Sequence, residues 1–374
     1  MADKLGVGVI GCGNISSAYF RLAPMFKGIE MRACADINMA AAEAQAEAFG
    51  LRAMSVDDLL ASDDIDIVVN LTIPAAHKDI CVAALDAGKH VYSEKPFVLS
   101  AEEGAMILSK AKTAGLRVGS APDTFLGGSH QLARKLIDDG AIGAVTSGTA
   151  VVQSPGMESW HPNPDFFFLP GAGPVLDLGP YYISNLVQLL GPVAAVQAVS
   201  STPRKTRVIG NGEREGEEVP VKTPTTIHST LQFHSGAVIT MLTSWDVWSQ
   251  SHGNMELYGE SGTLYLPDPN FFGGDVKVTD KGDMVDAPEW DHPFSVPNDG
   301  DHANYRAAGL SDMAIAIQEG RPHRCSAEFA HHVVDVMASI LTAGETGKRV
   351  EIGTTCERPA PLDGAAARAL MSAN

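Results

Sequence analysis

The sequence predicts an α/β protein in which a doubly wound parallel sheet is followed by an α+β domain with a large, mostly antiparallel open sheet. Up to about residue 120, short strands of small and branched residues alternate with helical patterns of about 10–15 residues, which is typical of a parallel sheet. Longer strands joined by short turns follow, which is typical of an antiparallel or mixed sheet. The 374 residues also exceed the roughly 250 to 300 at which one hydrophobic core stops growing.

The N-terminal domain is expected to span residues 1–123. Its first strand, at 5–10, alternates small and branched residues and leads through a glycine turn at 11–16 into a helical pattern that continues to Phe26. An alanine-rich stretch at 38–49 predicts a helix, because alanine has the highest helix propensity. The remaining strands are predicted at 30–35, 66–71, 90–93 and 117–120, and the remaining helices at 75–87 and 101–114.

The second domain is expected to span residues 124–374 and to begin with a helix at 128–139. The turn at 234–236 lies between two strand patterns and predicts a hairpin. A charged, glycine-containing stretch at 205–223 predicts an exposed loop, and the tail from Thr354, rich in proline and alanine, is expected to extend over the surface. Strands are predicted at 144–153, 193–201, 225–233, 238–245, 254–259 and 263–266, and two closing helices at 304–319 and 327–343.

Composition excludes several classes of protein. A hydrophobic content of 45% and a charged content of 19% are those of an ordinary soluble globular protein. The chain has 27 Lys and Arg against 45 Asp and Glu, a net charge of −18, and no basic block, so nucleic acid is not an expected partner. No apolar run approaches the roughly 18 residues of a membrane span, and the N-terminus lacks the pattern of a secretory signal.

The cysteines and histidines predict neither a disulfide framework nor a metal site. The five cysteines are odd in number and widely scattered, which fits free thiols in a reducing cytoplasm. His331 and His332 are adjacent, so on a helix they point about 100° apart and cannot form an i, i+4 ligand pair. We therefore expect two exposed helix histidines.

A dinucleotide site is predicted at the glycine turn after the first strand. Gly11 and Gly13 match the first two glycines of the G-x-G-x-x-G fingerprint, and Ser16 is small enough to replace the third. The turn residues Gly11, Gly13, Asn14 and Ile15 would let a pyrophosphate approach the backbone at the helix N-terminus.

Asp36 ends the second strand, near the offset of about 20 residues at which the fingerprint expects the acid that bonds the ribose hydroxyls. A carboxylate there would repel a 2′-phosphate, and Ile37 and Asn38 supply no arginine, so NAD is expected and NADP is not favoured. The alternative is that Asp36 only caps the following helix.

Two later strand ends add side chains to the same edge of the sheet. Thr72, Ile73 and Pro74 follow the strand at 66–71 and would lie beside the cofactor. His77 is either another cofactor neighbour or a plain first-turn histidine.

The strand at 90–93 ends in Glu94, Lys95 and Pro96, and a lysine there points into the crevice where open α/β sheets bind ligands. Glu94 and Lys95 are therefore candidates for the cofactor site. In an isolated Glu-Lys-Pro, two solvated charges before a loop proline would be the ordinary interpretation.

Four motifs follow one another along the chain: Gly-Cys-Gly-Asn at 11–14, Thr-Ile-Pro-x-x-His at 72–77, Glu-Lys-Pro at 94–96, and Gly-Ala-Gly-Pro-Val-Leu-Asp-Leu-Gly-Pro-Tyr at 171–181. As a set they make nearly the whole sequence resemble the glucose-fructose oxidoreductase, inositol dehydrogenase and rhizopine-catabolism (Gfo/Idh/MocA) family. The resemblance implies that Lys95 contacts the nicotinamide ribose and the reacting oxygen of the substrate, and that Asp177 lies across the crevice on a second-domain helix. It also implies a Rossmann domain and a homodimer or homotetramer formed through the open sheet.

Many members of that family carry a histidine base four residues after this aspartate, whereas this chain has Tyr181. Residues i and i+4 share a helix face, so Asp177 and Tyr181 can both face the site. The ordinary pKa of a phenol, about 10, is too high for an efficient base, but an adjacent ammonium such as Lys95 favours the phenolate. Some sugar-oxidising members are similar in using tyrosine here. The alternative is that Tyr181 only packs, with its hydroxyl bonded to the backbone.

Residues 158–168 contain prolines and a phenylalanine run that exclude a regular element. Trp160, His161 and Asn163 offer an aromatic face and polar tips, which suit the wall of a polyol site or, alternatively, a rigid loop at a subunit contact. His161 is the alternative base, because the ordinary pKa of histidine is about 6.5. His302 is a further substrate-site candidate, with Arg306, at the start of a later helix, although most such pairs are solvated.

These residues predict an NAD(H)-dependent oxidoreductase acting on a secondary alcohol or ketone of a sugar, glycoside or cyclitol. Lys95 would polarise the developing alkoxide, Tyr181 or His161 would take the hydroxyl proton, and Asp177 would orient the substrate or the base. Two rivals remain open: a hydrolase or lyase in which tightly held NAD oxidises a glycoside transiently, and a non-catalytic NAD or sugar sensor.

Overall fold

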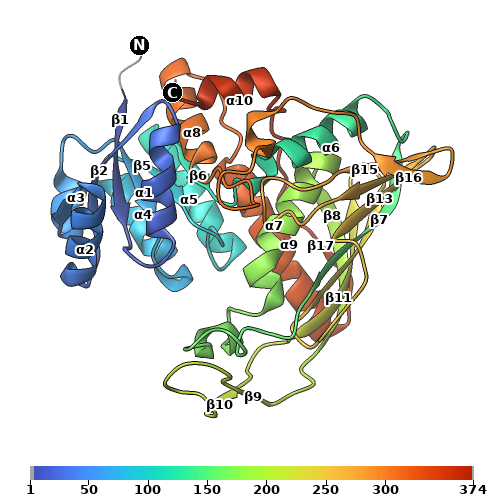
Figure 1. Cartoon of the computed structure of the whole chain (residues 1–374). Coiled ribbons are helices and arrows are strands. Elements are labelled where there is room, and N and C mark those ends of the chain that lie inside the picture. The colour runs from blue at the N-terminus through green and yellow to red at the C-terminus, as the bar shows by residue number, and fades with distance from the viewer. Residues whose placement is uncertain (1–3, 373–374) are drawn as a thin grey trace.

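The computed structural model describes residues 4–372, and its first sheet confirms the predicted parallel architecture (Figure 1). Six parallel strands lie in the order β3-β2-β1-β4-β5-β6. Their bounds are β1 (Leu5–Ile10), β2 (Ile29–Ala35), β3 (Arg52–Met54), β4 (Ile67–Asn70), β5 (His90–Ser93) and β6 (Val118–Ser120). The strand order reverses between β1 and β4, and ligands bind at the carboxyl ends of strands at such a point.

Helices α1 (Ser16–Leu22), α2 (Met39–Phe49), α3 (Val56–Ala61), α4 (His77–Asp86) and α5 (Ala101–Ala114) belong to this sheet. Helix α5 begins where the Ser100 side chain accepts a hydrogen bond from Glu103 and ends at Gly115 in the left-handed region, as local capping rules predict. The elements β3 and α3 were not predicted. They span three and six residues, which is too short for a period to show.

The second sheet has nine strands in the order β16-β15-β14-β13-β7-β12-β11-β8-β17. It is mixed, because β12 pairs with β7 in parallel while its other pairs are antiparallel. The hairpin predicted around 234–236 joins β11 to β12 and is confirmed. The bounds are β7 (Val145–Gln153), β8 (Val193–Ser201), β11 (Thr226–Phe233), β12 (Val238–Ser244), β13 (Met255–Gly259), β14 (Thr263–Leu266), β15 (Lys277–Asp280), β16 (Asp283–Asp286) and β17 (Val350–Glu351).

Three helices, α6 (Gly128–Asp138), α7 (Pro174–Leu190) and α9 (Ala327–Thr346), lie on the side of the second sheet that faces the first (Figure 1). Helix α9 packs on β8 and also contacts α5 and β6, so it joins the two halves of the fold. Helix α7 is buried at every position from Gly179 to Leu190, because it packs against both α9 and the sheet. The boundary expected at 123/124 stays a prediction.

The stretch at 205–223 is not simply an exposed loop. It contains β9 (Thr206–Val208) and β10 (Glu218–Pro220), which pair in a small antiparallel sheet. The Arg207 side chain is fully buried and forms ion pairs of 2.8 Å with Glu158 and 2.7 Å with Asp246. Both partners are distant in sequence, so the charged residues of this stretch did not reveal that Arg207 would be buried.

Two predictions about the C-terminal third were also wrong. The helix expected at 304–319 is α8 (Ala308–Glu319), so residues 304–307 form an entering loop. His332 is fully buried on α9 rather than exposed, and it accepts a hydrogen bond from the Val193 amide at 2.9 Å. The partner Val193 begins β8 and is 139 residues away in sequence, so the sequence around His332 gives no sign of this contact.

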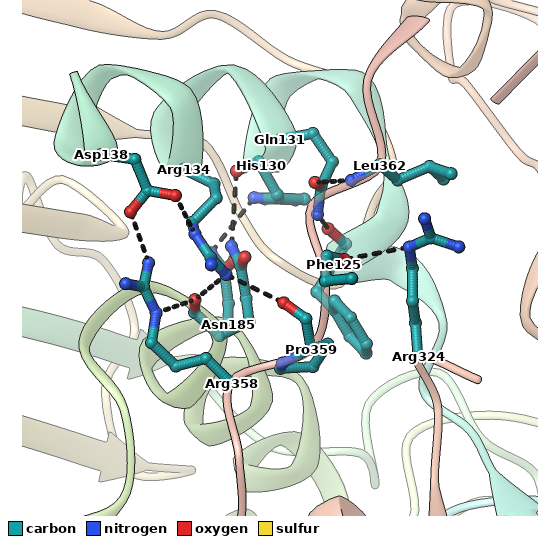
Figure 2. A network of polar contacts seen from close by, with 12 residues as sticks. Phe125, His130, Gln131, Arg134, Asp138, Asn185, Arg324, Arg358, Pro359 and Leu362 are labelled. Atoms are coloured by element: carbon teal, nitrogen blue, oxygen red, sulfur yellow. Dashed lines mark hydrogen bonds and ion pairs between the residues drawn. The ribbon is translucent and has the colours of Figure 1, made fainter. Parts of the chain in front are cut away.

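The tail runs without regular structure from 354 to 363, as predicted, but it then forms α10 (Gly364–Leu370) and is anchored by hydrogen bonds. Figure 2 shows side chains of earlier elements bonded to it: Arg134 donates to the Pro359 carbonyl at 3.3 Å, and the Leu362 amide donates to Gln131 at 2.7 Å. Beyond α10, Met371 forms a bridge with Phe26 beside the first sheet. The tail therefore connects both domains. Within residues 4–372, no helix is long and apolar enough to cross a bilayer.

Candidate active site

The glycine turn lies at the carboxyl end of β1, against the end of β4. Gly11 has a φ of +104°, and a Cβ there would lie 2.6 Å from the carbonyl carbon and oxygen of Leu71, so only glycine fits. A Cβ on Gly13 would meet nothing within 4 Å, so this side of the turn is open. The pair thus combines a close approach to the sheet with an accessible backbone, which is what a bound pyrophosphate requires.

Asp36 faces this turn from the end of β2. Its Oδ2 accepts a hydrogen bond from the Cys12 amide at 2.8 Å, and its Oδ1 accepts one from the Asn38 amide at 2.8 Å. The N-cap of α2 is Asn38, so Asp36 is not the helix cap. Each carboxylate oxygen has a further lone pair with which to accept a ribose hydroxyl.

Two exposed isoleucines flank the same edge. Ile37 is fully exposed after β2, and Ile73 is 70% exposed after β4. Large apolar side chains so exposed beside a polar turn offer flat faces to an aromatic ring such as adenine. Ile73 was predicted and Ile37 was not, although its place directly after the strand-end carboxylate was the available signal.

His77 ties together the loops after β4 and β5. Its ring is buried, with Nδ1 2.7 Å from the Pro96 carbonyl oxygen and Nε2 3.0 Å from the Thr72 carbonyl oxygen. Thr72 is held in turn, since its hydroxyl donates to the Asn70 side chain at 2.7 Å. Thus His77 is more than a plain first-turn histidine, because it fixes the spacing of two loops that border the crevice.

The structure brings Lys95, Asp177 and Tyr181 together across the crevice. The Lys95 Nζ lies 2.9 Å from both the Oδ1 and the backbone oxygen of Asp177, and 5.2 Å from the centre of the Tyr181 ring. Burial alone lowers the pKa of Lys95, but the neighbouring Tyr181, Asp177 and Glu94 outweigh it and leave that pKa raised. The lysine is therefore a firmly charged donor, and its Lys95–Pro96 peptide bond is cis.

Helix α7 supplies Asp177 and Tyr181 from its first two turns. Gly173, at a φ of +97°, leads into the helix, and Pro174 occupies the first helical position, where its missing N–H is not needed. A second proline, Pro180, lies inside the helix and cannot donate to the carbonyl of Leu176. Asp177 and Tyr181 are one turn apart on a single face, as their i, i+4 spacing predicts.

Glu94 is buried beneath Lys95. Its Oε1 accepts hydrogen bonds from the Tyr19 hydroxyl at 3.0 Å and from Arg306 Nη1 at 2.7 Å, and its Oε2 accepts one from the Lys95 amide at 2.8 Å. Although burial raises the pKa of Glu94, Arg306 and Lys95 hold it below the ordinary value. Arg306 thus reaches the site through Glu94, from the loop before α8 rather than from a helix start.

Trp160, His161, Asn163 and His302 are not joined to this centre. The Trp160 side chain is 57% exposed, the His161 ring packs among the aromatic rings of its own loop, and Arg214 of the β9–β10 hairpin donates to Asn163 at 3.4 Å. The His302 ring stacks on Phe271 at 4.8 Å. Within residues 4–372, none of the hydrogen bonds or ring contacts of these four side chains reaches Lys95, Asp177 or Tyr181. In the same range, no group of three or more His, Cys, Asp or Glu side chains could hold a metal ion.

Sequence and structure comparisons show which proteins this chain is similar to. Levoglucosan dehydrogenase of Pseudarthrobacter phenanthrenivorans is 27% identical over 293 residues, which cover 70% of this chain and 73% of that protein. D-glucoside 3-dehydrogenase of Escherichia coli is 22% identical over 365 residues, 94% of this chain and 98% of that protein. A solved structure of levoglucosan dehydrogenase in complex with NADH and levoglucosan has the same fold, with a TM-score of 0.78 at 22% identity over 94% of this chain and all of that one.

Two family models match consecutive parts of the chain. Residues 5–121 match the oxidoreductase family with an NAD-binding Rossmann fold, and residues 130–265 match the GFO/IDH/MocA C-terminal domain. The first match covers the glycine turn, Asp36 and Lys95, and the second covers Asp177 and Tyr181. The chain therefore belongs to the Gfo/Idh/MocA family of NAD-dependent oxidoreductases.

Proposed function

We propose that this oxidoreductase transfers hydride between NAD and a secondary alcohol or ketone of a sugar, glycoside or cyclitol. The observation that carries the proposal is the convergence of Lys95, Asp177 and Tyr181, an ammonium, a carboxylate and a phenol, at the carboxyl end of β5. The names of the two relatives, a levoglucosan dehydrogenase and a D-glucoside dehydrogenase, support a carbohydrate substrate.

The cofactor is proposed to lie along the carboxyl ends of β1, β2 and β4. The open side of Gly13 would take its pyrophosphate, Asp36 its ribose hydroxyls, and Ile37 and Ile73 its adenine. When bound, NAD supplies the hydride acceptor of the oxidation. Asp36 supports NAD over NADP, because its negative charge repels a 2′-phosphate.

Asp36→Asn is expected to weaken NADH binding about tenfold and to narrow the preference over NADPH, because one charged acceptor is lost from the ribose contact. Titration of the nicotinamide fluorescence with both cofactors measures this. Asp64→Asn is the matched control, because Asp64 lies in the same domain in a surface pair with Arg52 and should leave both affinities unchanged. If the ratio of the NADH and NADPH affinities is unchanged in Asp36→Asn, residues other than Asp36 determine the choice of cofactor.

Proton transfer and charge stabilisation are assigned to separate side chains. Two of the three Lys95 donors are directed at Asp177, which leaves the third for the substrate oxygen that becomes negative as the carbinol hydrogen departs. Tyr181, as the phenolate, takes the hydroxyl proton and becomes the neutral phenol. Its contact with the Lys95 ammonium supports that role over His161, whose ring packs within its own loop. Asp177 keeps the ammonium aimed at the crevice.

The direct test is NADH absorbance with purified protein, NAD or NADP, and a panel of aldoses, glycosides and inositols. We expect NADH to accumulate with one substrate class, and Tyr181→Phe to lower kcat by about 10²-fold, as expected for loss of a general base. Tyr182→Phe is the matched control, because Tyr182 is the next residue of α7 and its hydroxyl contacts Asn254 instead.

Each rival has its own signature in that assay. A glycoside cleaved without net NADH would favour the redox-assisted hydrolase, and cofactor binding without turnover would favour the sensor. If Tyr181→Phe is unharmed while His161→Asn is inactive, the base is His161.

A homodimer or homotetramer is proposed to form through the open face of the second sheet. On the face of β11 away from α7 and α9, His228 and Gln232 are exposed, and the alternate residues Thr226 and Thr230 are half-buried. Light scattering coupled to size exclusion measures the assembly, and a monomer would contradict the proposal.

A further inference from the structure

A buried ion-pair network lies directly under the proposed catalytic lysine. The Glu94 carboxylate receives donors from three parts of the chain: Tyr19 on α1, the Lys95 amide in its own turn, and Arg306 before α8. Only 9% of the Glu94 side chain and 17% of the Arg306 side chain are exposed. Both carboxylate oxygens of Glu94 therefore accept hydrogen bonds from protein groups. The clearest effect of these bonds is to fix the backbone that carries Lys95.

The backbone next to Arg306 is held in an unfavourable conformation. Ala307 has a φ of +82°, in the left-handed region that alanine rarely adopts, and it is completely buried. Such conformations persist only where their surroundings enforce them, and they gather at functional sites. Here the turn at Ala307 starts α8 and directs the preceding arginine toward Glu94.

The start of α8 is tightly packed, which leaves Arg306 little freedom to move. The Gly309 amide donates to the buried Asp123 carboxylate at 3.1 Å. A Cβ on Gly309 would lie 2.5 Å from the Tyr92 hydroxyl and 2.8 Å from the Cys325 sulfur. The arginine is thus anchored by a contact with the first sheet, although it comes from the last quarter of the chain.

The titratable groups that face Glu94 are Arg306, Lys95, Tyr19, Tyr92 and Asp123. Burial raises the pKa of Asp123 to about 6, and burial also raises the pKa of both tyrosines. Arg306 is therefore the nearest positive charge that is not itself part of the proposed reaction. Without it, Glu94 would be a buried carboxylate balanced by Lys95 alone, and such a group takes up a proton.

We propose that Arg306 is a positioning residue for Lys95: its ion pair with Glu94 keeps that carboxylate charged and thereby holds the Glu94–Lys95–Pro96 turn, and with it the lysine Nζ, aimed at Asp177 and the substrate. This role rests on the proposed function for its effect on turnover. It acts on no atom of the substrate, so its loss shifts the lysine without removing a reacting group.

The experiment compares Arg306→Met, Arg306→Lys and Glu94→Gln with the wild-type protein in kcat, KM and NADH affinity from pH 6 to pH 8. Arg306→Met should lower kcat by about tenfold to a hundredfold, because a displacement of about 1 Å can cost that much. The loss relative to wild type should be larger at pH 6 than at pH 8, because Glu94 without Arg306 takes up a proton more readily as the pH falls. Arg306→Lys keeps the charge and should recover most of the rate, whereas Glu94→Gln should show a loss that does not change with pH.

Arg324→Met is the matched control. Arg324 comes from the same part of the chain, its side chain is 12% exposed, and it pairs at 2.6 Å with the buried Asp312 of α8. Its loss should lower the unfolding temperature without changing kcat or its pH profile. If Arg306→Met does no more than Arg324→Met, or keeps wild-type kcat and NADH affinity, the positioning role is wrong.

Two further readouts keep the test decisive. If Arg306→Met does not fold, Arg306→Lys and Glu94→Gln decide, since a pH-independent loss in the glutamine variant and rescue by lysine follow only from positioning. If none of the tested sugars lets the wild type reduce NAD, the proposed function is wrong, independently of the role of Arg306. NADH affinity, measured by fluorescence without substrate, then still tests Arg306, because it should depend more strongly on pH in Arg306→Met than in the wild type.

Discussion

Lys95→Met is expected to lower kcat by about 10³-fold while the protein still folds and binds NADH. Within residues 4–372, the Lys95 ammonium is the one cation that pairs with Asp177 and also lies over the Tyr181 ring, so it serves the developing oxyanion and the base together. Removing one preorganised donor to an oxyanion commonly costs about 10²- to 10³-fold, and the loss of its influence on the phenol adds to this. Methionine preserves the length and most of the packing of the lysine stem. Initial rates of NADH formation at saturating NAD and substrate measure the effect.

Lys95→Met has two effects, the loss of the ammonium and the unpaired charge of the Asp177 carboxylate, and a second variant separates them. Lys95→Met leaves Asp177 without its partner, and the double variant with Asp177→Asn relieves that charge. We expect both to be equally slow, because charge relief does not restore an oxyanion donor. Lys89→Met is the control at the opposite end of β5, where Lys89 bonds the Ser62 carbonyl, and it should retain full activity. Recovery of the rate in the double variant would mean that Lys95 only neutralises Asp177.

Elements with local signals at both ends could be predicted to the residue. The strands β5 and β14 have their predicted bounds, and α5 starts after Ser100 and stops before Gly115, where a capping hydroxyl and a left-handed glycine act on adjacent backbone. The tail gave no such signal. Its order comes from Arg134 and Gln131, which satisfy tail backbone groups from more than 200 residues away (Figure 2).

The candidate site divides in the same way. The i, i+4 spacing of Asp177 and Tyr181 fixed their common helix face, and strand position pointed Lys95 toward the crevice. The pairing of Lys95 with Asp177, 82 residues apart, was implied only by the family resemblance. Nothing local indicated that Arg306 would meet Glu94 across 212 residues, or that His77 would bridge two carbonyls. Such contacts depend on packing between elements, which one sequence does not display.

Acid is expected to destabilise this protein, chiefly because two buried histidines, His130 and His332, must remain neutral. The His130 Nε2 lies 2.8 Å from the Phe271 carbonyl oxygen. Its Nδ1 lies 3.1 Å from the Asn185 amide nitrogen (Figure 2). One donor and one acceptor are required, which only the neutral ring supplies. The His332 Nε2 accepts from the Val193 amide in the same way. Burial lowers the pKa of each histidine from 6.5 to about 4.

Because burial lowers the pKa of both histidines, acid lowers the free energy of unfolding. Both folded-state pKa values lie below the unfolded value, so the unfolded chain binds more protons between pH 6.5 and pH 4, and stability falls as the pH falls through that window. At pH 5 each histidine should cost about 2 kcal/mol of the free energy of unfolding relative to pH 8. Asp123 opposes them, since its pKa is raised from 3.8 to about 6, and it should return about 1 kcal/mol at pH 5. From these three groups the net expected loss is about 3 kcal/mol. Burial also lowers the pKa of His292 and His323, which adds to the loss.

Urea unfolding of the wild type at pH 8 and pH 5 measures this loss, and two variants should move it in opposite directions. The double variant His130→Gln and His332→Gln keeps a donor and an acceptor at each position but no longer titrates there, so its stability should be lower at pH 8 and its loss between pH 8 and pH 5 should be much smaller than that of the wild type. Asp123→Asn removes the opposing carboxyl while retaining an acceptor for Gly309, so its loss between pH 8 and pH 5 should exceed that of the wild type. A wild-type slope that survives in the glutamine double variant would assign acid sensitivity to other groups. If the free energy of unfolding of Asp123→Asn changes with pH as it does in the wild type, then the wild-type Asp123 carboxylate is already ionised at pH 5. Arg306 would then compensate its charge fully.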